Sequence, residues 1–137
     1  CPQLMRALSK PGTKAPWTCS AVGKICLAFS KPSTVSQIIN QAGFTQFTRK
    51  SIIDEASFSR EIAKAKQIAY AIDDEENSEG LRCIASPIFD ANSVVIGALS
   101  VSGPSVRIEE QKLPNFGRVT LRTAKELTRA LGGTWPS

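Results

Sequence analysis

The sequence contains no histidine, and this absence excludes several familiar catalytic arrangements. Histidine is the commonest general base, so neither a Ser-His-Asp triad nor a Cys-His pair can be built within this chain. Zinc and redox motifs of the C-x-x-C type are also absent, because no such pairing occurs among the four cysteines, Cys1, Cys19, Cys26 and Cys83. We therefore expect no cofactor, and we expect most of the thiols to be reduced and structural.

Long hydrophobic runs are missing as well. No apolar run approaches the roughly 18 residues that a membrane span requires, and the first residues lack the basic, apolar and cleavage regions of a signal peptide. We expect a cytoplasmic protein with no membrane partner. Its 137 residues, 42% hydrophobic and 21% charged, have the size and composition of one globular domain. Because the chain starts at Cys1 and its only methionine is Met5, we expect it to be a piece of a longer protein.

The net charge of +5 raises the question of nucleic-acid binding. Lysine and arginine are scattered along the sequence, with no basic stripe interleaved with aromatic residues and no helix-turn-helix pattern. The sequence favours a solvated basic surface over direct binding of DNA by this chain.

The first half of the sequence predicts mainly helices. A strand is expected at 4–9, before a Pro-Gly turn. Apolar residues at helical intervals then predict a helix that begins near Ser20, capped by Ser20 or Thr18, and two further helices at 34–41 and 57–68.

The second half predicts strands followed by a helix. A short strand starts at Tyr70, and β-rich runs at 81–89 and 94–102 flank the turn residues 90–93, which indicates a hairpin. The run 94–102 is nearly all apolar or small, as is typical of a central strand buried on both faces. A long helix over 113–131 follows. This order predicts an α+β fold, with helices packed on a mostly antiparallel sheet.

Four short segments of the second half form an ordered signature. They are Asp73-Asp74-Glu75-Glu76, Gly80-Leu81-Arg82-Cys83-Ile84-Ala85, Pro87-Ile88-Phe89-Asp90 and Ala98-Leu99-Ser100-Val101-Ser102-Gly103-Pro104. Together they resemble the effector-domain signature of the IclR family of bacterial transcription regulators. The segments 20–24 and 130–132 are similar to further blocks of that family, in the same order.

The resemblance implies that residues 1–137 are an effector-binding domain with a GAF-like or profilin-like fold and no enzymatic activity. For the intact regulator it implies a homodimer or homotetramer, and operator DNA bound through an N-terminal winged helix-turn-helix domain that is absent here. It also implies a pocket for a small metabolite, often an organic acid. Carried over position by position, the ligand-binding residues are Ser20, Ala21, Val22, Asp73, Cys83, Ser100 and Ser102.

The chemistry of these positions suits a small carboxylate or oxo-acid. Free amides at the start of the Ala21 helix, together with the positive end of its dipole, favour a carboxylate. Ser100 and Ser102 are two residues apart and project from the same face of a strand, so both hydroxyls are offered to a ligand. Cys83 on the neighbouring strand adds a soft wall, and Asp73 accepts from a ligand hydroxyl or restrains the site.

Structural roles for the same residues stay open. The two serines are explained equally by small residues beneath a packed helix, and Cys83 by a core thiol. The acidic segment 73–76 is explained by a solvated turn, or by one acid paired with Arg82.

Near the first helix, Gly23 is explained by close packing alone and Lys24 by a surface position. The sequence also departs from the common family pattern at Thr18 and Cys19, where a histidine and an alanine are frequent, and at Glu109, which replaces a usual capping residue.

Two other functions also stay open. One is a pure oligomerisation module that binds no metabolite. The other is an N-terminal cysteine amidohydrolase, in which Cys1 is the nucleophile and its own amine is the base.

Overall fold

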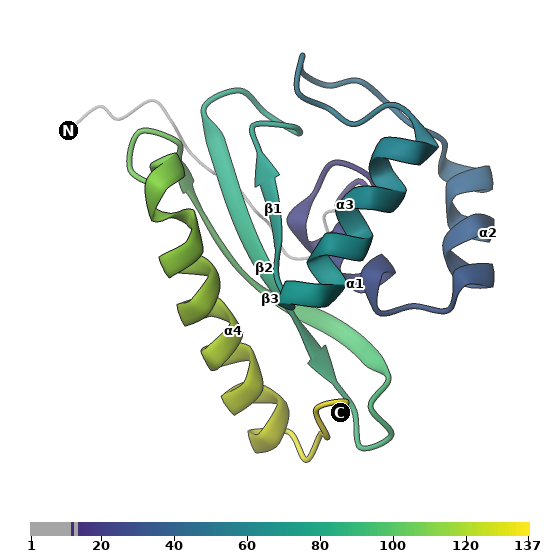
Figure 1. Cartoon of the computed structure of the whole chain (residues 1–137), viewed down its shortest axis with the longest axis vertical. Helices are drawn as coiled ribbons and strands as arrows, with labels where there is room; N and C mark the ends of the chain where they lie inside the picture. Colours follow the sequence, from purple (N-terminus) through teal and green to yellow (C-terminus); the bar gives the residue numbers. More distant parts are fainter. Residues whose placement is uncertain (1–11, 13) are drawn as a thin grey trace.

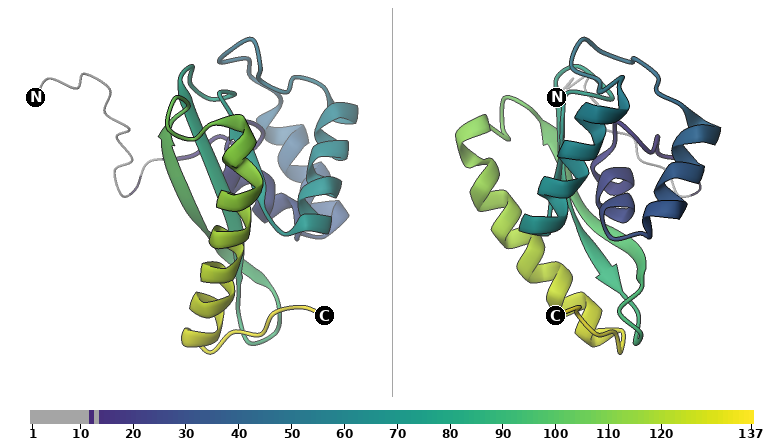
Figure 2. Two further views of the ribbon diagram at one scale, coloured as in Figure 1. Left: turned by 60° about the vertical axis from the view of Figure 1, so that its left-hand side comes forward. Right: turned by 45° about the vertical axis from the view of Figure 1, so that its right-hand side comes forward.

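The computed structural model describes residue 12 and residues 14–137, so the strand expected at 4–9 lies outside the described residues. The elements follow in the order α1 (Ala21–Ala28), α2 (Pro32–Ala42), α3 (Glu55–Ile68), β1 (Ala71–Asp74), β2 (Leu81–Phe89), β3 (Val95–Pro104), the short 3-10 helix η1 (Glu110–Lys112) and α4 (Leu113–Ala130). Helices α1 to α3 lie on one side of the sheet and α4 runs along the other (Figures 1 and 2). The predicted α+β class is confirmed.

The three strands form an antiparallel sheet in the order β1-β2-β3. The predicted hairpin is confirmed, and Asp90 shapes its turn by accepting hydrogen bonds through Oδ1 from the amides of Asn92 and Val94, at 2.8 and 2.9 Å. Among the described residues, the run 94–102 is not the central strand buried on both faces that the sequence predicted. Within the described sheet only β2 has a neighbour on both sides, so β3 lies at an edge. Ile96 on β3 is 59% exposed.

Two helices begin earlier than their hydrophobic spacing predicted, for local reasons. Pro32 occupies the first turn of α2, where its missing amide costs no hydrogen bond. Asp54 caps α3 by accepting from the amide of Ser57 at 2.8 Å. Gly43 ends α2 with a φ of 65°, a conformation that favours glycine.

The sheet separates two apolar clusters. Under α1 the buried side chains are small, apart from Ile25, and comprise Ala21, Ile25, Ala28, Ala65, Ala71 and Ala85. On the opposite face the buried residues are larger side chains, Ile84, Ile108 and Leu113, with half-buried Tyr70, Ile72 and Phe116 packed against them. Alternate residues of β2 thus serve opposite layers.

Helix α4 carries Pro114 in its first turn. After it the chain turns back onto the hairpin, where the amide of Thr134 donates to the carbonyl of Asp90 at 2.9 Å. The ring of Trp135 meets that of Phe89 edge-on, with 4.9 Å between centroids. Among the described helices, none has the length and apolar character needed to cross a membrane.

Candidate functional site

The site begins where the chain enters α1. Ser20 caps the helix with extended dihedrals, and its Oγ accepts from the amide of Gly23 at 3.0 Å while donating to the carbonyl of Pro16 at 2.5 Å. Ser20, and not Thr18, is therefore the cap. Because both hydrogen bonds occupy its hydroxyl, Ser20 would contribute to a ligand site mainly by fixing the position of the helix start.

The first two amides of α1 have no partner within the helix. Ala21 and Val22 precede the amides that the cap satisfies, so no carbonyl of α1 accepts from them. Gly23 allows the incoming chain to lie against the first turn, since a Cβ there would stand 2.5 Å from the carbonyl oxygen of Trp17. The close-packing role expected for Gly23 is confirmed.

Three of the predicted residues share one row of the sheet. Asp73 on β1 lies opposite Cys83 on β2, which lies opposite Ser102 on β3. The hydroxyl of Ser102 donates to the sulfur of Cys83 at 3.0 Å. Ser100 stands two pairs along, on the same face of β3, opposite Ala85, which belongs to the cluster under α1. The structure therefore brings these side chains to the face that α1 covers.

Enclosure of a ligand by this row stays a prediction. Ser100 and Ser102 are exposed in the described structure, so they are not small residues beneath a packed helix, and Cys83 is half-buried. A cleft of about 240 Å³ lies elsewhere, between α3, β1 and the start of α4, and none of the seven predicted residues lines it.

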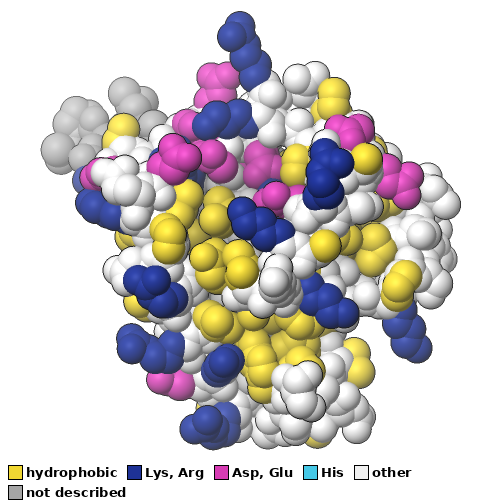
Figure 3. Space-filling view, viewed as in Figure 1, with side chains coloured by type: hydrophobic (Ala, Val, Ile, Leu, Met, Phe, Trp, Pro, Cys, Tyr) yellow, Lys and Arg dark blue, Asp and Glu magenta, His cyan; other side chains and the backbone are white. Residues whose placement is uncertain are grey.

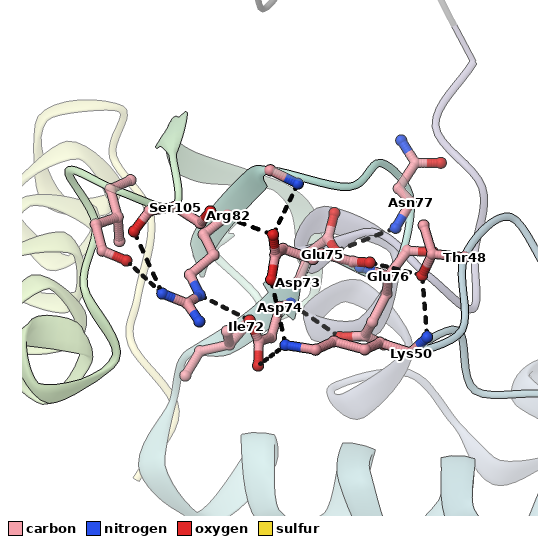
Figure 4. A network of polar contacts seen from close by, with 12 residues as sticks. Thr48, Lys50, Ile72, Asp73, Asp74, Glu75, Glu76, Asn77, Arg82 and Ser105 are labelled. Carbon is pink, nitrogen blue, oxygen red and sulfur yellow. Dashed lines mark hydrogen bonds and ion pairs between the residues drawn. The ribbon is translucent and has the colours of Figure 1, made fainter.

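The acidic segment at the end of β1 divides into two buried and two half-buried carboxylates, whose polar contacts are drawn in Figure 4. Asp73 is 2% exposed, and its Oδ1 accepts from the amides of Glu76 and Asn77 at 2.8 and 3.3 Å. Burial raises the pKa of Asp73 to about 6. Asp74 pairs with Arg82 at 2.7 Å, which confirms the expected acid-arginine contact. A fully solvated turn is wrong, because Asp73 and Glu76 are buried.

Lys24, which the sequence placed on the surface, is instead a buried cation with no exposed side-chain area. Its Nζ donates to Oε2 of Glu76 at 2.6 Å and to the carbonyl of Ile72 at 2.7 Å, and lies 3.5 Å from Oε1 of Glu61. The surface interpretation is wrong because α1 packs on the sheet with Lys24 directed at β1. This one ammonium joins α1, α3, β1 and the turn that follows β1.

Two hydroxyls from the loop before α3 hold the same turn, and sequence reasoning missed both. Thr48 donates to the carbonyl of Glu75 at 2.6 Å, and Ser51 donates to the carbonyl of Glu76 at 2.5 Å. Both hydroxyl residues are buried. Lys50 reaches the carboxylate of Glu75 at 3.2 Å from the solvent side. The turn that positions Asp73 is thus held by the loop before α3 as well as by Lys24 of α1.

The thiols near the site are protonated at neutral pH. Burial, reinforced by the charges of Asp73 and Glu76, raises the pKa of Cys19 to about 11. Burial also raises the pKa of Cys83 and of Cys26. The three are free cysteines, in line with reduced and structural thiols. Cys1 lies outside the described residues.

The basic residues are less scattered in space than in sequence. Dark blue side chains gather over α4 in Figure 3, where four exposed residues recur at intervals of four, three and four: Arg118, Arg122, Lys125 and Arg129. This spacing places them on one side of the helix. The grouping depends on the helix and is not visible in the linear sequence, where the same charges are scattered.

An α+β domain with a capped helix start facing a polar row of the sheet has a clear counterpart among known proteins. The chain belongs to the IclR family, since the model of the bacterial transcriptional regulator IclR C-terminal region matches residues 1–129. It is 34% identical over 134 residues to the acetate operon repressor of Salmonella typhimurium, covering 98% of this chain and 49% of that protein. The chain thus spans about half the length of this curated relative.

Two solved structures show the same fold. The Thermotoga maritima IclR crystal structure superposes with a TM-score of 0.87 at 30% identity, covering 96% of this chain and 53% of that one. The inducer-binding domain of an Acinetobacter PobR double mutant, in complex with 3-hydroxybenzoic acid, gives a TM-score of 0.79 at 27% identity, covering 93% and 76%. The relatives named here are transcription regulators and not enzymes, in agreement with the non-enzyme prediction and against the amidohydrolase alternative.

Proposed function

We propose that this chain is the effector-sensing part of a longer, cytoplasmic IclR-type repressor and that it binds a small carboxylate or oxo-acid between α1 and the sheet. The observation that carries the proposal is the alignment of Asp73, Cys83 and Ser102 in one row of the face covered by α1. Operator DNA would be bound by the remainder of the regulator, which would act as a homodimer or homotetramer.

Backbone amides and serine hydroxyls, which are hydrogen-bond donors, support the anionic character that we propose for the effector. The amides of Ala21 and Val22, at the positive end of the helix dipole, are suited to a carboxylate. The exposed hydroxyls of Ser100 and Ser102 would fix the orientation of its remaining oxygen atoms. The PobR domain provides support for this class, because the compound in its complex, 3-hydroxybenzoic acid, is a carboxylic acid.

An assembly module without a ligand is the second candidate. The exposed apolar side chains of β3, Ile96 at 59% and Val101 at 37%, favour a role for that strand in contacts with another chain.

A thermal-shift screen separates the two candidates. We expect pyruvate or 3-hydroxybenzoate to raise the melting temperature, and a ligand at a hundred times its Kd stabilises by about 2.7 kcal/mol. The matched neutral probes, pyruvamide and 3-hydroxybenzamide, should have little effect. Equal stabilisation by the amides would remove the anion from the proposal, and no stabilisation by any carboxylate would favour the assembly module.

Calorimetry on variants then locates the site. Ser100→Ala should weaken carboxylate binding by about 0.5 to 1.5 kcal/mol through loss of one hydrogen bond. Val22→Pro removes one candidate amide at a position in the first turn that accepts proline, so affinity should fall there also. Ser59→Ala, an exposed serine on α3, serves as the matched control. Unchanged affinity in both site variants would place the ligand elsewhere.

A further inference from the structure

A carboxylate lies inside the site that we propose for an anion. Asp73 is 2% exposed and stands in the same row as Cys83 and Ser102. If the proposed function holds, a negatively charged effector meets a buried negative charge. On that function, the repulsion between the effector carboxylate and Asp73 must be relieved when the effector binds.

The charged and titratable groups around Asp73 offer no free cation. From the α1 side it is faced by Cys19 and Lys24, from the following turn by Glu76, and from β2 by Cys83. The ammonium of Lys24 is already in contact with Glu76 at 2.6 Å and with a backbone carbonyl. Among the hydrogen bonds of the described residues, none joins Lys24 to Asp73.

One oxygen of Asp73 is committed to the fold. Its Oδ1 accepts from the amides of Glu76 and Asn77, which holds the carboxyl group in a fixed orientation. A proton on the other oxygen, Oδ2, leaves both of these hydrogen bonds intact. It also turns that oxygen into a donor.

Protonation is the least costly response to an arriving anion. A second negative charge a few ångströms away disfavours the ionised form of a buried carboxylate, as in pairs of acids that share one proton. Burial has already brought the pKa of Asp73 to about 6, so little further change is needed near neutral pH. The Asp73 carboxylate and the incoming carboxylate would otherwise repel each other in a water-poor setting.

We propose that Asp73 takes up one proton from solvent when a carboxylate binds, and that its Oδ2–H then donates a hydrogen bond to an oxygen of the bound anion. One proton enters with each effector, so the complex carries no additional net charge. Affinity is then level at pH values where Asp73 is already protonated in the free protein. It falls up to about tenfold per pH unit above that range. The sensor therefore responds to acidity as well as to the metabolite.

The test is calorimetric titration with pyruvate and with 3-hydroxybenzoate, from about pH 5 to about pH 8.5, in paired buffers of different ionisation enthalpy. We expect close to no proton uptake at the acid end, and an uptake that rises above the pKa of Asp73 in the free protein and is largest between that pKa and the higher pKa of Asp73 in the complex. Asp73→Asn keeps an oxygen for the two amides and supplies an N–H donor to the ligand. This variant should bind with no proton uptake and with an affinity independent of pH.

Asp74→Asn is the matched control, since Asp74 pairs with Arg82 and its pKa is held below the usual range despite partial burial. It should retain the pH dependence of the wild type. If Asp73→Asn does not fold, the carboxyl carbon of Asp73 is titrated by NMR in the wild type, where saturating ligand should raise its pKa by at least about one unit.

The outcomes separate the two levels of the proposal. Carboxylate binding without proton uptake, or with the same pH slope in Asp73→Asn as in the wild type, overturns this inference and leaves the proposed function standing. An Asp73 pKa that ligand does not move has the same meaning. Failure of both carboxylates to bind removes the proposed function, and the inference falls with it.

Discussion

The two faces of the sheet differ in the size and polarity of the side chains they bury. Toward α4, β2 presents Ile84 to a cluster of bulky aliphatic and aromatic residues. Toward α1 it presents Cys83 and Ala85, and the buried polar groups Lys24 and Asp73 lie on this side. Bulky apolar contacts stabilise the α4 face, whereas small residues bring α1 and its amides close to the sheet. Strand β2 thus supports stability on one face, and on the other it carries a residue of the site that we propose.

The largest effect is expected from breaking the α1 face at its ion pair. Lys24→Met leaves the buried carboxylate of Glu76 without its cation, which typically costs about 3 to 5 kcal/mol of unfolding free energy. Urea denaturation measures the loss. Lys24→Met combined with Glu76→Gln should recover part of it, because the double variant removes the charge of Glu76 together with that of Lys24. A single variant as stable as the wild type would show that the pair contributes nothing to the fold.

A somewhat smaller effect is expected on the α4 face. Ile84 is fully buried, so Ile84→Ala should lower the unfolding free energy by about 3 kcal/mol through lost burial and the cavity left behind. Its affinity for a carboxylate should match that of the wild type, because the side chain points away from the site. Ile96→Ala, which truncates an exposed isoleucine on β3, is the control and should change stability by less than about 0.5 kcal/mol. Equal losses of unfolding free energy in Ile84→Ala and Ile96→Ala would show that the buried cluster on the α4 face does not stabilise the fold more than an exposed side chain does.

The smallest effect on unfolding free energy is expected at the start of α1. It measures how much the cap at Ser20 stabilises the helix, independently of any ligand. Ser20→Ala removes the hydroxyl that caps α1 and should cost about 1 kcal/mol, whereas Ser20→Gly should cost only a few tenths. Ser33→Ala, near the start of α2 where no side chain caps the helix, should have almost no effect. Thermal unfolding of the three variants tests this order, and a loss for Ser33→Ala equal to that for Ser20→Ala would refute it.

Local signals in the sequence were sufficient for the elements that depend on neighbouring residues. The cap at Ser20 and the turn at 90–93 both act within a few positions. The position of β3 in the sheet was not available in this way, because small and apolar residues do not reveal how many strands lie beside them. Lys24 had a usable signal, since it lies three residues after Ala21 and four before Ala28, both of which are buried.

The candidate site shows the same division. The resemblance supplied its residues, and the strand register supplied the row of Asp73, Cys83 and Ser102. The anchors Thr48 and Ser51 were missed because their partners lie more than twenty positions away, in a turn whose acidic residues looked solvated. Such contacts form only after the loop and the sheet have met.

The placement of the two tryptophans gives the chain optical reporters in distinct surroundings. Trp17 is 41% exposed, and its backbone lies against the first turn of α1, next to the proposed anion site. Trp135 packs on Phe89 at the far end of the hairpin. Replacing Trp135 by phenylalanine would leave Trp17 as the only indole, so its emission would register events at the helix start without labelling. Effector arrival and global unfolding would then be observed as separate spectral changes in one sample.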